Sequence, residues 1–451
     1  MKMQKNRYFR YIPIVNLEYS MGMVKIGLIG FGNVGQSVVS ILEKNATLLE
    51  QRTGQAIRVK RIVVRNIEKY KPLLPDSIEL STDFNSLIED PEISIIVELI
   101  GGEFPAFDYI SRALKAKKYV VTANKEVISK HKKAFFKLAK ENQVDIFFEA
   151  AVAGGIPIIR SLKVGFSANK IEALYGIVNG TTNYILTKIS EEKKEFQDVL
   201  KEAQQLGFAE ADPTMDISGL DAAHKLVILA AVAFKVDVPL SSVFYEGIES
   251  ISLKDILYAN ELGYCIKLLA IGRRAQNEKM TFKVHPTMIP LDHPLATVRN
   301  EMNAVFLKGN AVGEVMLSGK GAGGSPTGSA VISDIIDIAF DQTHNTTMRN
   351  LEPTLNPTEL MKQEEIQSQF YVRIFLKDHP SMLEKVTGTL GSNAISISKI
   401  LQKNIQDDTA ELVIVTHASL EKDMHSALHS LQTLEGICSI ETLIRVRLDE
   451  N

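Results

Sequence analysis

The chain is poor in cysteine: of its 451 residues, two are cysteines, Cys265 and Cys438. They stand far apart in apolar surroundings, which disfavours a disulfide framework or a thiolate metal site and predicts buried, reduced thiols. Apolar runs of membrane-spanning length are missing, and so is an apolar signal core near the N-terminus. We therefore expect a cytoplasmic protein with no membrane partner.

An excess of charge of one sign is missing too. The formal net charge is −3 at pH 7 and no long basic block occurs, which disfavours nucleic acid and anionic membranes as main partners. Apolar residues, in contrast, make up 45% of the chain. At this length they suffice for several buried cores, and small-molecule chemistry becomes the default function.

A strand, a glycine turn and a helix are predicted near residue 30. Val24–Ile29 is an apolar run typical of a buried strand, residues 36–42 read as helix, and between them stands Gly30-Phe31-Gly32-Asn33-Val34-Gly35. This order suits a dinucleotide pyrophosphate, because Gly30 makes the turn, Gly32 lets the phosphate approach and Gly35 packs the helix on the strand. A tight turn without a ligand is the alternative.

Four more strand patterns follow, separated by helical stretches, at residues 57–64, 93–100, 119–122 and 144–148. This alternation predicts a Rossmann-type doubly wound parallel sheet with ligands at the carboxyl ends of its strands. At those ends stand Arg65, where a cation suits a 2′-phosphate, the Gly101 loop, which can run past a nicotinamide, and Lys125. We expect NADP(H) to be preferred with NAD(H) still usable, while Lys125 can alternatively be a solvated lysine at a helix start.

A dense group of carboxylates lies between Gly207 and Lys225. It ends in Asp221 and Lys225, directly before the very apolar run 226–234. One interpretation is structural: Ser218 and Asp221 fit a capping box, and Asp221 and Lys225 have the spacing of a surface ion pair. The other is a pocket for a small zwitterion, because the apolar run indicates a buried helix with Lys225 facing a cleft.

Five motifs in this order closely resemble those of homoserine dehydrogenases over about residues 23–345. They are the glycine turn, Thr122-Ala123-Asn124-Lys125, Asn179-Gly180-Thr181-Thr182-Asn183-Tyr184-Ile185, the run 207–225, and Gly321-Ala322-Gly323-Gly324-Ser325-Pro326-Thr327. The resemblance implies reversible NAD(P)H-dependent reduction of aspartate 4-semialdehyde to homoserine, a step toward threonine and methionine.

The resemblance also implies roles for individual residues. Lys225 matches the usual proton donor, Lys125 a second lysine at cofactor and substrate, and Asp221 the residue that orients the lysine. Glu210, Asp216, Gly180 and Thr181 would bind the substrate, and Gly323 would join the residues 30–35, Arg65, Gly101 and Lys125 at the cofactor. A sodium ion would be held by Glu149 and the main-chain oxygens of Val152, Gly154 and Ile156, although a Gly/Pro hinge is the alternative there.

The C-terminal part carries a βαββαβ pattern typical of a ferredoxin-like unit, and it resembles an ACT amino-acid-sensing domain. Where that family has Asp-x-Pro-Gly, this chain has Asp378-His379-Pro380-Ser381, which puts a threonine effector in doubt because glycine permits close backbone approach. Pairing of sheet edges between subunits is the alternative role, and we expect a homodimer or homotetramer.

The predicted organisation has three folded units. It comprises an N-terminal extension 1–22, disordered or forming an extra strand, a nucleotide-binding Rossmann domain 23–150, an α+β catalytic and dimerisation domain 151–320, a return helix 321–345, a linker 346–368 and an ACT domain 369–451. Two rival functions remain: a ligand-binding regulatory protein that has lost catalysis, and a dehydrogenase acting on another amino acid. Glu210, Asp221 and Lys225 together argue against the first, and the runs 179–184 and 207–225 against the second.

Overall fold

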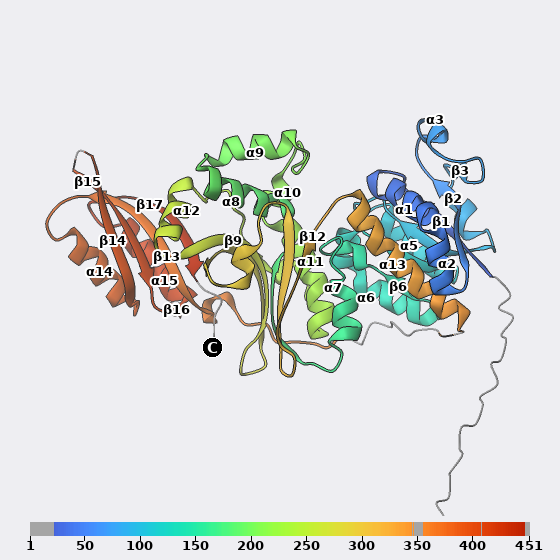
Figure 1. Cartoon of the computed structure of the whole chain (residues 1–451). Helices are drawn as coiled ribbons and strands as arrows, with labels where there is room; N and C mark the ends of the chain where they lie inside the picture. Colours follow the sequence, from blue (N-terminus) through green and yellow to red (C-terminus); the bar gives the residue numbers. More distant parts are fainter. Residues whose placement is uncertain (1–21, 345, 347–354, 407, 447–451) are drawn as a thin grey trace, which may run out of the picture.

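The structure is a computed structural model that describes residues 22–344, 346, 355–406 and 408–446. Residues 1–21 of the expected extension and residues 347–354 of the expected linker lie outside the described residues. The chain forms three units that lie in line, with the N-terminal unit at one end and the C-terminal unit at the other (Figure 1).

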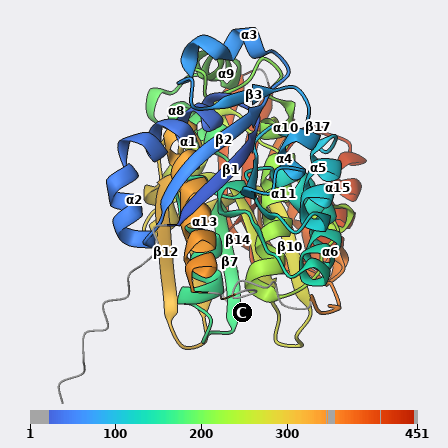
Figure 2. The same cartoon turned by 90° about the vertical axis from the view of Figure 1, so that its right-hand side faces the viewer.

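The N-terminal unit is built on a six-stranded parallel sheet in the order β3-β2-β1-β4-β5-β6. Most residues of the central strands β1 and β4 are apolar and buried, because helices cover both faces of the sheet. In Figure 2, α1, α2 and α13 lie on one side, with α4, α5 and α6 on the other. The elements are β1 (Met23–Ile29), α1 (Asn33–Lys44), α2 (Ala46–Thr53), β2 (Ala56–Val63), α3 (Ile67–Tyr70), β3 (Glu79–Ser81), α4 (Asn85–Ile88), β4 (Ile93–Glu98), α5 (Ala106–Lys115), β5 (Tyr119–Thr122), α6 (Lys125–Asn142) and β6 (Ile146–Phe147).

The strand order reverses between β1 and β4. At such a switch point the loops after the two strands diverge and leave a crevice at their carboxyl ends, which is where open parallel sheets bind ligands. The predicted Rossmann-type sheet is confirmed.

The middle unit is an antiparallel sheet in the order β12-β11-β7-β9-β10, to which the short strand β8 adds in parallel beside β10, with helices on its flank. Its last helix, α13, leaves the sheet and packs along α1 of the N-terminal unit, as expected for a return helix. The elements are α7 (Ile158–Arg160), β7 (Ile171–Ile177), α8 (Gly180–Glu192), α9 (Phe196–Gln205), α10 (Thr214–Ile217), α11 (Leu220–Leu229), β8 (Phe244–Tyr245), α12 (Leu253–Glu261), β9 (Tyr264–Arg274), β10 (Met280–Pro290), β11 (Met302–Gly309), β12 (Gly313–Lys320) and α13 (Gly324–Thr343).

The C-terminal unit continues the same sheet, an arrangement that the sequence did not predict. Its strands β17-β13-β15-β14 are antiparallel, and β17 pairs in parallel with β10, placing Thr287 opposite Arg445. Across this seam Arg373 is buried and ion-paired to Asp255 of α12 at 2.7 Å. The elements are β13 (Gln367–Lys377), α14 (Met382–Ser392), β14 (Ile397–Gln406), β15 (Thr409–Thr416), β16 (Ser419–Leu420), α15 (Glu421–Gln432) and β17 (Ile437–Val446).

The prediction that both cysteines are buried is wrong. Both are free thiols, but Cys265 is half-buried and Cys438 is exposed. Cys438 lies on β17, where the side chains next to it along the strand point the other way and an apolar neighbourhood in sequence does not fix the face. Among the described residues, no helix is both long and apolar enough to cross a membrane.

Candidate active site

One buried carboxylate, that of Asp221, lies between two lysines. Lys225 donates to Asp221 Oδ2 at 2.7 Å from the next turn of α11, and Lys125 Nζ lies 2.5 Å from Oδ1. Lys125 is the first residue of α6 and belongs to the N-terminal unit. The Lys125–Asp221 ion pair therefore joins the N-terminal unit to the middle unit at this point.

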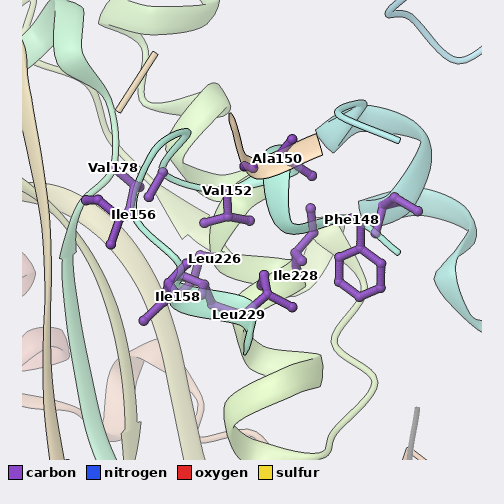
Figure 3. Close-up of a cluster of buried hydrophobic side chains, with 14 of the residues drawn as sticks. Phe148, Ala150, Val152, Ile156, Ile158, Val178, Leu226, Ile228 and Leu229 are labelled. Atoms are coloured by element: carbon purple, nitrogen blue, oxygen red, sulfur yellow. The ribbon is translucent and has the colours of Figure 1, made fainter. Parts of the chain in front are cut away.

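The helix that carries this carboxylate is apolar nearly all round, because it is buried on nearly all sides. Figure 3 shows its side chains packed against the 148–158 segment; the labelled residues are Leu226, Ile228 and Leu229 of α11 with Phe148, Ala150, Val152, Ile156, Ile158 and Val178. With α11 held in this way, the side chain of Lys225 is 13% exposed and also donates to the carbonyl of Val178 at 2.7 Å. The expectation of a buried helix is confirmed.

The capping-box prediction is wrong. The N-cap of α11 is Gly219, with φ +84°, and it forms no side-chain cap, whereas Ser218 ends α10. Asp221 is the second residue of α11 and its carboxylate turns to the lysines. The surface ion pair of the structural interpretation is also wrong, because Asp221 is 2% exposed.

The two lysines keep the carboxyl group of Asp221 ionised. Burial alone would raise the pKa of Asp221, but Lys225 and Lys125 hold this pKa well below its usual range. Burial also acts on Lys125, lowering its pKa, yet the charges of Asp221, Asp216 and Glu210 outweigh burial and leave the pKa of Lys125 raised. At neutral pH the site therefore holds a carboxylate and an ammonium group.

Asn179 is a residue of this site that the sequence analysis did not single out. Its side chain caps α8 through the N–H of Thr182 and donates to Asp216 Oδ1 at 2.7 Å and to Asp221 Oδ2 at 2.9 Å. The Asn-Gly pair before a helix is a recognisable cap signal. Nothing local, however, shows that the other end of the amide holds two carboxylates together.

The predicted substrate residues surround this cluster. The Thr181 hydroxyl donates to the carbonyl of Phe208 at 2.6 Å and lies 3.1 Å from Asp216 Oδ2. Gly180 lies so close to the backbone at Glu301 that a Cβ at position 180 would be 2.9 Å from the carbonyl oxygen of Glu301. Glu210 lies on an exposed loop before α10, near enough to Lys125 to help raise its pKa. Carboxylate, hydroxyl and ammonium groups thus lie close together around Asp221.

The glycine turn lies at the switch point of the parallel sheet. Gly30 has φ +93°, and a Cβ on Gly35 would be 2.6 Å from the carbonyl of Gly30. The backbone at Gly32 is open, with no atom within 4 Å of where a Cβ would stand. These are the three environments that a pyrophosphate turn needs: a left-handed turn, open approach, and close helix packing.

The remaining predicted cofactor residues lie around the same crevice. Phe31 is buried edge-on against Tyr70, whereas Asn33 at the start of α1 is exposed and Val34 is half-buried. Arg65 is exposed just beyond the end of β2, and Gly101, with φ +70°, faces open space after β4. Gly323 is the N-cap of α13, which packs on α1.

The predicted cation loop contacts the Gly319–Gly323 segment. Gly155 donates to the carbonyl of Lys320 at 3.0 Å. The carboxylate of Glu149 accepts the N–H groups of Ile159 and Arg160 at 2.8 and 2.7 Å, so it caps the short helix α7. Among the described residues, no cluster of three acidic, histidine or cysteine side chains offers a metal site. A cation here would depend on main-chain oxygens.

A pocket of about 370 Å³ lies in the C-terminal unit at the turn between β13 and α14. It is lined in part by Asp378, Ser381 and Gln402. Ser381 has φ +72°, so the turn keeps a left-handed backbone without glycine. This conformation is strained for a residue that carries a Cβ.

The chemistry of the main site follows from its neighbours. A dinucleotide bound at the switch point would lie at the carboxyl ends of β1 and β4, and α6 begins with Lys125 just after the neighbouring strand β5. Ammonium groups stabilise the negative charge that builds up on a carbonyl oxygen during hydride transfer. Fold and site together define a nicotinamide-dependent dehydrogenase for a small polar substrate.

Comparison with known proteins narrows this class. The model of the homoserine dehydrogenase NAD binding domain matches residues 30–149, and the homoserine dehydrogenase model matches residues 157–336. The chain is 41% identical to homoserine dehydrogenase of Bacillus subtilis and 42% identical to that of Synechocystis, each over 94% of this chain and 99% of the relative. The chain belongs to the homoserine dehydrogenase family of NAD(P)-dependent oxidoreductases.

Solved structures agree with this assignment. A homoserine dehydrogenase from Thiobacillus denitrificans superposes with a TM-score of 0.90 at 41% identity, covering 95% of this chain and 99% of that one. A hyperthermophilic archaeal homoserine dehydrogenase in complex with NADPH gives a TM-score of 0.60 at 29% identity, covering 74% of this chain and all of that one, 100%.

Proposed function

We propose that the chain reduces L-aspartate 4-semialdehyde to L-homoserine with a nicotinamide cofactor bound at the crevice between β1 and β4. The observation that carries the proposal is the buried carboxylate of Asp221, in contact with Lys125 and Lys225 where the two units meet. The cofactor supplies and accepts the hydride. Glu210 binds the substrate ammonium, Asp216 fixes the amino acid, and Gly180 and Thr181 line the pocket.

The two lysines divide the work. Lys225 is bonded to both Asp221 and the carbonyl of Val178, which fixes its ammonium group and leaves one N–H for the substrate oxygen. We assign it the proton transfer to the developing alkoxide. Lys125 is 37% exposed and held by Asp221 on one side; its raised pKa suits a permanent positive charge between cofactor and substrate.

For the cofactor we propose a preference for NADP(H), with NAD(H) also accepted. The support is Arg65, an exposed cation just past β2, in the position where NAD-selective sheets carry an acidic residue. The glycine turn 30–35, together with Gly101 and Gly323, would contact the rest of the cofactor. A sodium ion at the oxygens of Glu149, Val152, Gly154 and Ile156 is part of the same proposal, because this loop contacts the Gly319–Gly323 segment.

For the organisation we propose the division given by the sequence, with the 369–451 unit as an ACT domain and the pocket at Ser381 as its effector site. The βαββαβ order and the strand order β17-β13-β15-β14 support that assignment. The proposed effector is an amino acid, for which threonine is the candidate to test given that Ser381 stands in place of the usual glycine, and the proposed assembly is a homodimer or homotetramer.

The test follows NADPH consumption with aspartate semialdehyde, with and without threonine, for the wild type and two variants. Lys225→Ala should abolish turnover and leave the Kd for NADPH nearly unchanged. Lys132→Ala is the matched control, because Lys132 is a buried lysine that pairs with Asp237 away from the site. Substantial turnover by Lys225→Ala would remove Lys225 from its role, and a folded but inactive wild type would overturn the proposed reaction.

A further inference from the structure

A second buried carboxylate, that of Glu98, lies at the carboxyl end of β4. Its residue is 0% exposed. Transferring a carboxylate out of water is costly unless donors surround it. Burial indeed raises the pKa of Glu98, whereas hydrogen bonds from Thr122, Ile100, Gly101 and Asn124 act in the opposite direction. Its partners in the described part of the chain are neutral donors.

One oxygen of Glu98 holds the loop that follows its own strand. Oε1 accepts the N–H of Ile100 at 2.8 Å and, more weakly, that of Gly101 at 3.4 Å. Gly101 and Gly102 both have positive φ, +70° and +73°. A loop of two left-handed glycines has little rigidity of its own, so the carboxylate is what fixes its path.

The other oxygen of Glu98 reaches the neighbouring strand. The Thr122 hydroxyl donates to Oε2 at 2.6 Å and accepts the N–H of Asn124 at 3.0 Å. Asn124 is the N-cap of α6, the helix that begins with Lys125. Its amide closes the circuit by donating to the carbonyl of Gly102 at 2.7 Å.

The two sides of the crevice are therefore connected through one side chain. We propose that Glu98 is a positioning residue for hydride transfer: it holds the Gly101 loop against the cofactor and, through Thr122 and Asn124, sets the start of the helix that presents Lys125. Because it rests on the proposed function of Gly101 and Lys125, the wild type is assayed in every series.

The first variant is Glu98→Gln. It keeps the shape of the side chain and one acceptor oxygen, but it removes the charge and puts an NH₂ donor in place of the other oxygen. Glu411→Gln is the matched control, since Glu411 is also buried and accepts from Tyr258 and Arg373 at the seam with the C-terminal unit. We expect Glu98→Gln to lower kcat at least tenfold and to raise the Kd for NADPH severalfold. Glu411→Gln should lose thermal stability and keep both constants within about twofold.

The second pair separates positioning from folding if Glu98→Gln is unstable. Thr122→Val removes the hydroxyl at nearly constant volume, and Thr122→Ser keeps it. We expect Thr122→Val to lower kcat at least fivefold and Thr122→Ser to restore it to within twofold of the wild type. Thr122→Val should lower kcat by a smaller factor in the Glu98→Gln background than in the wild type, because residues in one network do not act additively.

The outcomes are decisive. Unchanged kcat and cofactor Kd in Glu98→Gln, or equal losses in Thr122→Val and Thr122→Ser, overturn the role of Glu98 while the active wild type upholds the reaction. A folded wild type that fails to consume NADPH with the semialdehyde overturns the proposed function itself.

Discussion

Replacing Asp221 by asparagine tests the central ion pairs most directly. The substitution keeps the size of the side chain and its contact with Asn179, but leaves the ammonium groups of Lys125 and Lys225 without the anion now 2.5 and 2.7 Å away. Breaking a buried pair by removing one partner costs about 3–5 kcal/mol. Because Lys125 is 37% exposed, we expect a loss of about 2–3 kcal/mol in the free energy of unfolding.

The kinetic effect of Asp221→Asn should exceed its effect on stability. The carboxylate of Asp221 is among the groups that keep the pKa of Lys125 raised. Without this carboxylate the pKa of Lys125 should fall, which moves the alkaline limb of the pH–rate profile toward neutral pH. We expect kcat to fall by about 10²–10⁴, the range for losing a positioned acid.

The assay is the pH dependence of kcat, followed by NADPH absorbance, together with denaturant unfolding. Asp255→Asn is the matched control, because Asp255 is a buried carboxylate bonded to Arg373 far along the fold. It should lose about 3–5 kcal/mol of stability with its alkaline limb in place. The reasoning is refuted if Asp221→Asn leaves the alkaline limb at its wild-type pH and keeps kcat within tenfold of the wild-type value.

Acid should also act through Asp221. A carboxyl whose folded pKa is depressed contributes stability above its unfolded pKa of about 4 and loses that contribution as the pH falls further. The wild type should therefore lose stability below about pH 4 more steeply than Asp221→Asn, as measured by urea unfolding across this range. Parallel curves would contradict the depressed pKa.

Three shorter predictions follow. Arg65→Asp should lower kcat/KM for NADPH relative to that for NADH at least tenfold, and an unchanged ratio would remove Arg65 from the phosphate site. Ser381→Gly should raise the free energy of unfolding by about 0.5–1 kcal/mol in denaturant titrations, because it relieves the left-handed backbone at φ +72°; a loss of stability would contradict this. Burial lowers the pKa of Lys267 to about 8, so the unfolded chain binds the extra proton above pH 8, and the wild type should gain about 3 kcal/mol between pH 8 and 10.5. Lys267→Met should lack this gain, and equal slopes would show that Lys267 is not the group responsible.

Much of the N-terminal unit is predictable from local patterns. Strands such as β1 and β4 lie between layers of helices, so their apolar runs stand out in the sequence. The glycine turn is also predictable from local sequence, because each glycine is required by a contact within a few residues or by the adjoining helix. The pairing of β17 with β10 is different: it joins edge strands of two separate units, and no local pattern in the sequence marks which edges pair.

The active site was predictable to the extent that its contacts are local. The spacing of Asp221 and Lys225 predicts their ion pair. Nothing near either residue, however, indicates that Lys125, at the start of a distant helix, contacts the same carboxylate. Asn179 is hidden in the same way: its cap is visible in the sequence, whereas its bonds to Asp216 and Asp221 are tertiary. Glu98 falls within the predicted strand 93–100, and a charged residue in a run that is otherwise mostly apolar is a usable signal of a functional role.

The failed capping box shows which force decided the local structure. A cap hydrogen bond from Ser218 or Asp221 is worth about 1 kcal/mol, whereas each hydrogen bond to a charged group is worth about 1.5–3 kcal/mol. Asp221 makes such contacts with two lysines, and it can do so only if its carboxylate turns away from the first turn of α11. Gly219, with φ +84°, lets the chain begin that helix without a side-chain cap. The loss of a cap at this helix is thus the local cost of aiming one carboxylate at both lysines.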